Sequence, residues 1–193
     1  MKNSLSKVVL VTMMATVPLM AGNYSYNTHS LFAIEGGATN IDVERAGATG
    51  GFDITKTNLP NIGLKLGAEG ENFRAFLGGR YYDAKDFDAL STLGGELQYL
   101  FNFSKHANFF LGANAGKAFI KIATDGTVPS VSTSSVYYGG DAGFNFHASE
   151  MIDLEIGAKY MALDVNEKVG VDTYTIDSMI TAYASVIIKW KMD

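Results

Sequence analysis

The chain has 193 residues, the usual size of one domain, of which 47% are hydrophobic and 18% charged. This composition excludes a disordered chain, and 21 Gly, 12 Phe and 10 Tyr with only 3 Pro favour strands over helices. The absence of Cys excludes disulfides, iron–sulfur clusters and thiol nucleophiles.

Residues 1–21 have the pattern of a secretory signal peptide. Lys2 and Lys7 precede the apolar stretch Val8–Leu19, which is too short to cross a bilayer as a helix, and the small residue Ala21 follows. We expect cleavage after Ala21, which leaves residues 22–193 as one mature domain with a net charge of −7 instead of −5. This acidic balance disfavours nucleic acid as a partner, because phosphate binding needs a basic surface.

Apolar and polar residues then alternate with period two along most of the chain. In one run, Ile62, Leu64 and Leu66 share a face opposite Gly63 and Lys65. Such runs cover residues 32–39, 62–69, 72–82, 93–103, 108–116, 136–147, 152–160 and 180–191. After the signal peptide, no stretch without charged residues is long enough for a transmembrane helix. The eight runs therefore predict an all-β fold, an eight-stranded antiparallel up-and-down transmembrane β-barrel.

The connections between the runs alternate in length. Three are short: Gly70–Glu71, Ser104–Ala107 and Ala148–Glu150. The other four are longer and polar: about Asn40–Asn58, Asp83–Ala89, Ala123–Thr133 and Leu163–Thr175. Short turns at one end and long loops at the other are typical of outer-membrane barrels.

Aromatic residues fall near both ends of the predicted strands. Those near the short turns or the last strand's end predict a periplasmic girdle of Phe73, Phe101, Phe103, Phe109, Phe144, Phe146 and Trp190. Those near the long loops predict an outer girdle of Tyr81, Tyr138 and Tyr160. Each girdle indicates a membrane–water interface.

Over residues 28–193 the strand number, loop asymmetry, girdles and signal peptide resemble the small eight-stranded outer-membrane barrels, similar to the outer membrane protein A transmembrane domain and its X-type relatives. The resemblance implies a Gram-negative outer-membrane protein that is surrounded by outer-membrane lipid and inserted by the barrel assembly machinery. It also implies a monomer without enzymatic activity or cofactor, with a role in envelope integrity or surface interaction. The loops contain no recognisable motif for an extracellular partner.

The polar faces of the predicted strands place charges of both signs in the lumen. We expect a lumen charge network of Glu35, Lys65, Glu69, Arg74, Arg80, Glu96, Asp141, Glu155 and Lys159. Arg74 and Arg80 are expected near carboxylates such as Glu69 and Glu96. Because eight strands leave room for little more than side chains, the network predicts a plugged lumen, with a conducting pore as the alternative.

Two other functions are compatible with parts of the pattern. A soluble periplasmic lipocalin-like barrel also alternates, with charged residues outside and an apolar cavity for a hydrophobic ligand inside. The segment His147-Ala-Ser149-Glu150 is similar to the histidine and serine pairing of outer-membrane acyl-transfer enzymes, but its place on a short turn favours a simple polar turn. The three histidines are too dispersed for a metal site.

Overall fold

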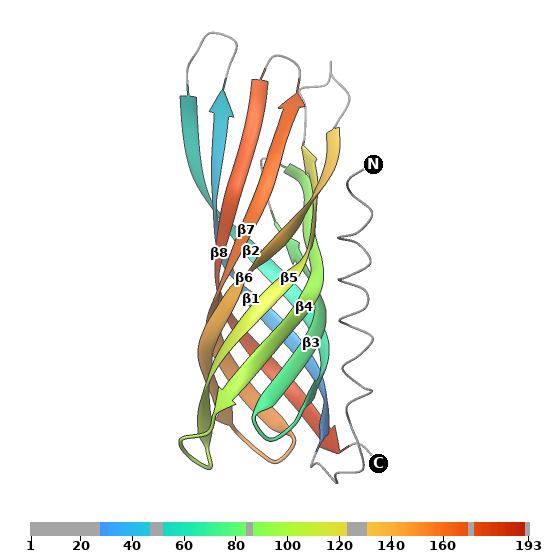
Figure 1. Cartoon of the computed structure of the whole chain (residues 1–193), viewed down its shortest axis with the longest axis vertical. Helices are drawn as coiled ribbons and strands as arrows, with labels where there is room; N and C mark the ends of the chain where they lie inside the picture. Colours follow the sequence, from blue (N-terminus) through green and yellow to red (C-terminus); the bar gives the residue numbers. More distant parts are fainter. Residues whose placement is uncertain (1–27, 47–51, 84–86, 123–130, 170–171, 192–193) are drawn as a thin grey trace, which may run out of the picture.

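The computed structural model describes residues 28–46, 52–83, 87–122, 131–169 and 172–191. Within them the chain forms eight strands: β1 (His29–Ala46), β2 (Phe52–Glu69), β3 (Phe73–Tyr82), β4 (Phe87–Phe101), β5 (Ala107–Ile122), β6 (Val131–His147), β7 (Ile152–Val169) and β8 (Asp172–Lys191). Each strand pairs antiparallel with the next, and β8 pairs with β1, which closes the barrel (Figure 1). The predicted fold class is confirmed.

The structure bears on the N-terminal segment and on the helical content of the described residues. The predicted signal peptide, residues 1–21, lies outside the described residues, so its cleavage stays a prediction. No helix among the described residues is long and apolar enough to cross a membrane.

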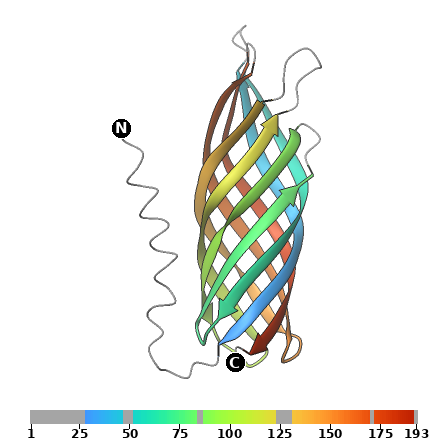
Figure 2. The same ribbon diagram turned by 90° about the vertical axis from the view of Figure 1, so that its right-hand side faces the viewer.

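The strands are inclined to the barrel axis, as the side view shows (Figure 2). Following register partners once around the barrel from His29 leads back to Thr39, ten positions further along β1. The path runs through His29, Glu69, Arg74, Gln98, Gly112, Asp141, Lys159, Thr181 and Thr39. This stagger brings side chains that are distant along the sequence to the same depth in the lumen.

The three short connections form tight turns, as expected. Gly70 N donates a hydrogen bond to Phe73 O at 2.8 Å, and Ala148 N donates one to Ile152 O at 3.0 Å. In the turn between β4 and β5, Ser104 Oγ accepts hydrogen bonds from the backbone of His106 and Ala107, both at 3.0 Å. These turns and the start of β1 lie at one end of the barrel, which we call the short-turn end (Figure 2).

At the opposite end, the loop end, the strands are longer than the sequence pattern predicts. Most of the expected loop Asn40–Asn58 is strand, because β1 extends to Ala46 and β2 starts at Phe52. The expected loop Leu163–Thr175 is likewise mostly strand, since β7 extends to Val169 and β8 starts at Asp172. The other two expected loops shrink less: β4 begins at Phe87 and β6 at Val131. The polarity of the two faces is exchanged here: among the residues whose side chains are described, those inside the barrel are apolar and those outside are mostly polar. On β8 a register shift between Ile176 and Met179 also changes the phase of the alternation.

This exchange divides the barrel into two sections. In the spanning section, from the short turns to the level of the outer tyrosines, large apolar side chains point outward and are exposed; they include Ile62, Leu64, Leu66, Leu77, Leu93, Leu97, Leu111, Leu154 and Ile156. In the loop-end section, the strand residues beyond those tyrosines, exposed outward positions include Asn58, Lys121, Ser132, Ser134 and Asp164.

The interior of the loop-end section is apolar. Its buried side chains belong to one cluster, the upper apolar cluster: Ile41, Leu59, Tyr82, Leu90, Ala118, Ile120, Tyr137, Met161, Leu163, Val165, Ile176 and Met179. On each strand that holds both, these residues lie nearer the loop end than the predicted lumen charges. The loop-end section therefore has the polarity of a water-soluble barrel, with apolar residues inside and polar residues outside.

Candidate functional site

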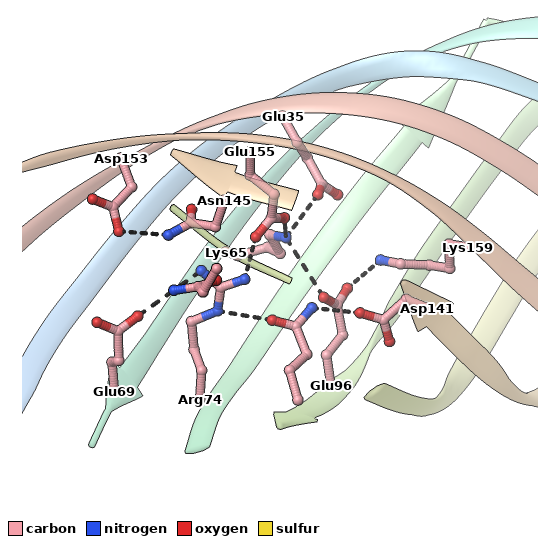
Figure 3. Close-up of polar contacts among 12 residues, drawn as sticks. Glu35, Lys65, Glu69, Arg74, Glu96, Asp141, Asn145, Asp153, Glu155 and Lys159 are labelled. Carbon is pink, nitrogen blue, oxygen red and sulfur yellow. Dashed lines mark hydrogen bonds and ion pairs between the residues drawn. The ribbon is translucent and has the colours of Figure 1, made fainter. Parts of the chain in front are cut away.

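The structure places all nine residues of the predicted lumen charge network inside the barrel. Eight of them are buried, and the side chain of the ninth, Glu96, is only 11% exposed. They come from β1, β2, β3, β4, β6 and β7, and they converge from around the wall of the barrel (Figure 3). Period-two alternation causes this, because every second side chain of each strand points inward.

Lys65 lies at the centre of the network. Its ammonium group is 3.0 Å from Glu35 Oε2, 3.4 Å from Glu155 Oε1 and 3.5 Å from Glu96 Oε2. The lysine is 2% exposed, so these three carboxylates replace its hydration. The neighbouring strand leaves room for it at Gly78, where a Cβ would lie 2.7 Å from Lys65 Cγ. One cation thus joins carboxylates from three other strands (Figure 3).

The two arginines of β3 bind different carboxylates. Arg74 pairs with Glu155, donates from Nε to Gln98 Oε1 at 2.8 Å, and lies 3.9 Å from Glu69 Oε2. Arg80 pairs with Glu35 on β1, to which its Nε donates at 2.9 Å, rather than with Glu96. Because Glu35 and Glu155 each also contact Lys65, the three cations share a connected set of carboxylates.

Lys159 and Asp141 complete the network on the far side of Lys65. Lys159 pairs with Glu96, whose other oxygen contacts Lys65. Asp141 accepts a hydrogen bond from Gln98 Nε2, so the amide of Gln98 connects Arg74 with Asp141. The sequence interpretation omitted Gln98 because it carries no charge, although its inward phase was visible.

A second polar cluster, also absent from the predicted site, closes the short-turn end. Asp153 accepts from Asn145 Nδ2 at 2.9 Å, pairs with His147 Nδ1 at 2.9 Å and lies 3.0 Å from Lys189 Nζ. All four residues are in the inward phase of their strands, which is the signal that could have identified them. Lys189 is also 3.9 Å from Glu69 Oε1, so this cluster continues into the lumen charge network.

Apolar side chains fill the lumen around the two polar clusters. Two small groups lie beside the network, Leu31 with Ala33, Phe76 and Ile187, and Leu100 with Phe110 and Tyr183. Two of their rings face the central cation, because Lys65 Nζ is 4.6 Å from the centroid of Phe76 and 5.2 Å from that of Tyr183. The upper apolar cluster lies on the loop-end side of the network. A cavity lined by Lys65, Arg80 and Tyr137 among others measures about 10 Å³, which is room for about one water molecule.

The predicted girdle residues lie on the outside of the barrel. Phe73, Phe101, Phe103, Phe144, Phe146, Trp190, Tyr81, Tyr138 and Tyr160 are between 43% and 68% exposed, and Phe109 is half-buried. Phe73, Tyr99, Phe101, Phe109 and Phe144 form a continuous ribbon with ring centroids 4.7–5.8 Å apart. Tyr99, which the girdle prediction omitted, is therefore part of the ribbon.

Lys117 is exposed on the outside of β5, on the same face as Leu111. Its ammonium group lies 5.6 Å from the centroid of the Phe119 ring, one outward position nearer the loop end. The side chain therefore extends toward the loop-end section, as expected for a lysine near the edge of an apolar surface.

The segment His147-Ala-Ser149-Glu150 does not assemble a nucleophile with a base. His147 pairs with Asp153 through Nδ1, and its Nε2 is 3.4 Å from Asn108 Nδ2. Ser149 Oγ instead accepts a hydrogen bond from Met151 N at 3.2 Å within the turn. In the described part of the chain, no group of three or more His, Asp or Glu residues is placed to hold a metal ion.

Comparison with known proteins supports the fold. No family model matches the sequence, and no curated protein matches it significantly. Neisserial surface protein A superimposes with a TM-score of 0.60 at 17% identity, over 82% of this chain and 97% of that one. The N-terminal β-barrel domain of Pseudomonas aeruginosa OprF gives a TM-score of 0.54 at 10% identity, over 85% and 98%. The chain therefore has the fold of the small eight-stranded outer-membrane β-barrels.

Proposed function

We propose that the protein is an integral outer-membrane barrel with a closed lumen, which supports the envelope and presents its loop end to the outside of the cell. In this orientation the short-turn end faces the periplasm. The outer leaflet meets the barrel near Tyr81, Tyr138 and Tyr160, and the phenylalanine girdle lies at the periplasmic interface. The loop-end section then extends into water.

The outward apolar surface of the spanning section carries the proposal. Leu64, Leu97 and Leu154 are 53%, 56% and 46% exposed, while Lys65 and Glu155 on β2 and β7 are 2% and 1% exposed. In water such a surface would cause association, whereas lipid is its natural solvent. A lipocalin-like barrel needs the opposite polarity in this section, with apolar residues lining a ligand cavity.

The packed lumen supports a closed barrel rather than a pore. Ion pairs, the upper apolar cluster and the aromatic groups occupy the interior, and the cavity within the charge network holds about one water. The proposal accordingly assigns neither transport nor catalysis to the protein. Its partners are outer-membrane lipid and, during insertion, the barrel assembly machinery, and the folded barrel is a monomer.

Two measurements on purified protein test the proposal. Folded protein should require detergent for extraction and should migrate faster on a gel before boiling than after, because every strand of a closed barrel is paired. Recovery of a soluble folded monomer from the periplasm would contradict membrane placement. In planar bilayers we expect no steady conductance, and a large stable conductance would contradict the closed lumen.

A further inference from the structure

A hollow of about 550 Å³ lies at the short-turn end of the barrel, beside the last residues of β8. Its lining comes from the start of β1, the turn between β6 and β7, and the end of β8: His29, Glu150, Met151, Lys189, Trp190 and Lys191. The start of β1 and the end of β8 lie side by side there (Figure 2). This volume is typical of a site for a small molecule, and we call it the β8 hollow.

The hollow forms because β8 extends past the first residue of β7. β7 starts at Ile152, which is opposite Ile188, so among the described residues Trp190 and Lys191 are in register only with β1. Lys189 N donates a hydrogen bond to Met151 O at 2.8 Å, which holds the turn between β6 and β7 next to β8. The end of β8 therefore faces this turn across the hollow.

The β8 hollow presents charges of both signs. Lys189 is already balanced, because its ammonium group is 3.0 Å from Asp153 Oδ2. Lys191 and Glu150 are exposed, and within the described part of the chain neither side chain forms a hydrogen bond or an ion pair. His29 is in register with Lys191 and adds an imidazole, which can donate an N–H. A cation and an N–H donor thus come from the strands, and a carboxylate comes from the turn.

The other two short turns lack this combination. The charged side chain in the turn between β2 and β3 is Glu71, and the turn between β4 and β5 carries Lys105 and His106. All three side chains are exposed. Each of these turns therefore presents one sign of charge, whereas the β8 hollow brings an unpaired lysine and an unpaired glutamate to one place.

The outer wall of the hollow is suited to the edge of a bilayer. Trp190 is 46% exposed on the outside of β8 and belongs to the predicted periplasmic girdle. Ile188, the next outward residue toward the middle of the barrel, is 39% exposed. An indole at the level of the lipid headgroups, with an apolar surface next to it, is typical of a membrane interface. A phospholipid can therefore place its acyl chains along Ile188 and its headgroup in the hollow.

We propose that the β8 hollow binds the headgroup of a phosphatidylethanolamine molecule. The headgroup phosphate accepts hydrogen bonds from Lys191 and His29, and its primary ammonium donates to Glu150. Phosphatidylglycerol has no ammonium, and phosphatidylcholine has no N–H to donate to the carboxylate, so both lipids lose the Glu150 contact. The assignment of this lipid to the inner leaflet of the outer membrane rests on the proposed function, but recognition of the headgroup does not.

Trp190 is the only tryptophan of the chain, so its fluorescence reports directly on the hollow. The folded barrel in a nonionic detergent is titrated with dihexanoyl phospholipids that differ only in their headgroup. We expect the Trp190 emission to change with a dissociation constant about tenfold lower for phosphatidylethanolamine than for phosphatidylglycerol or phosphatidylcholine. Equal dissociation constants, or no change in emission with any of the three lipids, would overturn the proposal.

Substitutions assign the two contacts and leave Trp190 in place. Glu150→Gln should remove the preference for phosphatidylethanolamine over phosphatidylglycerol, whereas Lys191→Gln should weaken the binding of both. The matched controls are Glu71→Gln and Lys105→Gln, which remove exposed charges from the other two turns and should bind like the native protein. Equal losses in the controls and in the hollow variants would overturn the proposal, because binding would then follow the overall surface charge.

Two further measurements separate the possible failures. Glycerophosphoethanolamine, which has the same headgroup without acyl chains, should bind about tenfold more weakly than the lipid, and equal binding would overturn the assignment to a lipid. Gel mobility before and after boiling, together with membrane extraction, reports on the barrel independently. A soluble protein that prefers the ethanolamine headgroup would contradict the proposed function alone, whereas a membrane barrel without this preference would contradict the lipid site alone.

Discussion

The spanning section and the loop-end section are built from the same strands but have opposite polarity. In the spanning section Lys65 is buried and Leu64 is exposed, whereas in the loop-end section Leu59 is buried and Asn58 is exposed. All four residues belong to β2, whose alternation continues without a break. The period of the pattern therefore determines the strand, and the surrounding solvent determines which kind of residue points outward.

Ion pairs stabilise the interior of the spanning section, whereas apolar contacts stabilise the interior of the loop-end section. Removing a buried charge from the spanning section should therefore have the largest effect on stability. Lys65→Met should leave Glu35, Glu96 and Glu155 close together without their shared cation. Breaking a buried ion pair on one side costs about 3–5 kcal/mol, so we expect a loss of this size in the free energy of unfolding. Urea titration in lipid vesicles, followed by gel mobility, measures it.

The matched control for this change is Lys117→Met on the exterior, where an exposed charge contributes less than about 1 kcal/mol. A similar effect of the two substitutions would show that the lumen network does not stabilise the barrel.

An arginine on the outer surface should also destabilise the spanning section more than the loop-end section. Leu97→Arg places a cation on the apolar surface of the spanning section, where it should cost about 2–4 kcal/mol near the middle of a bilayer. Ser134→Arg places it on the exposed outer face of the loop-end section, where a surface substitution changes stability by about 0.5 kcal/mol or less. The same titration compares them, and a larger penalty at Ser134 would reverse the assignment of the two sections.

A smaller effect distinguishes the packed interior of the loop-end section from the lipid-facing surface. Ile176 is 1% exposed within the upper apolar cluster, and Ile180 is 54% exposed on the exterior of the same strand. Ile176→Val should cost about 0.5–1.5 kcal/mol because it leaves a void, whereas lipid can fill the space beside Ile180→Val. Equal costs would indicate that the loop-end interior is loosely packed.

Period-two alternation was sufficient to predict the strands, their antiparallel order and the inward position of all nine lumen charges. It failed at the loop ends because the faces exchange there. Asn58, for example, ends the expected loop Asn40–Asn58, yet it lies within β2 together with Pro60, whose carbonyl accepts a hydrogen bond from Asp83 N.

The pairing within the lumen was harder to predict than the set of residues. Arg80 and Glu35 are on strands that are not neighbours, and they meet because the register places them at similar depth across the lumen. Both pair with Gly63 on the intervening strand β2, and this register between strands is not contained in any local sequence pattern. Asp153 and Lys189 were absent from the predicted network although their inward phase was readable from the alternation of their strands.

The depth of each section in a bilayer is the central claim, and the chain is well suited to measuring it because it has no cysteine. Leu97→Cys and Leu154→Cys for the spanning section, with Asn58→Cys and Ser134→Cys for the loop-end section, each give a unique site for a fluorescent label. Lipids brominated in their acyl chains should quench the first two labels, and aqueous iodide should quench the last two. Iodide quenching at Leu97 together with bromolipid quenching at Ser134 would contradict the account.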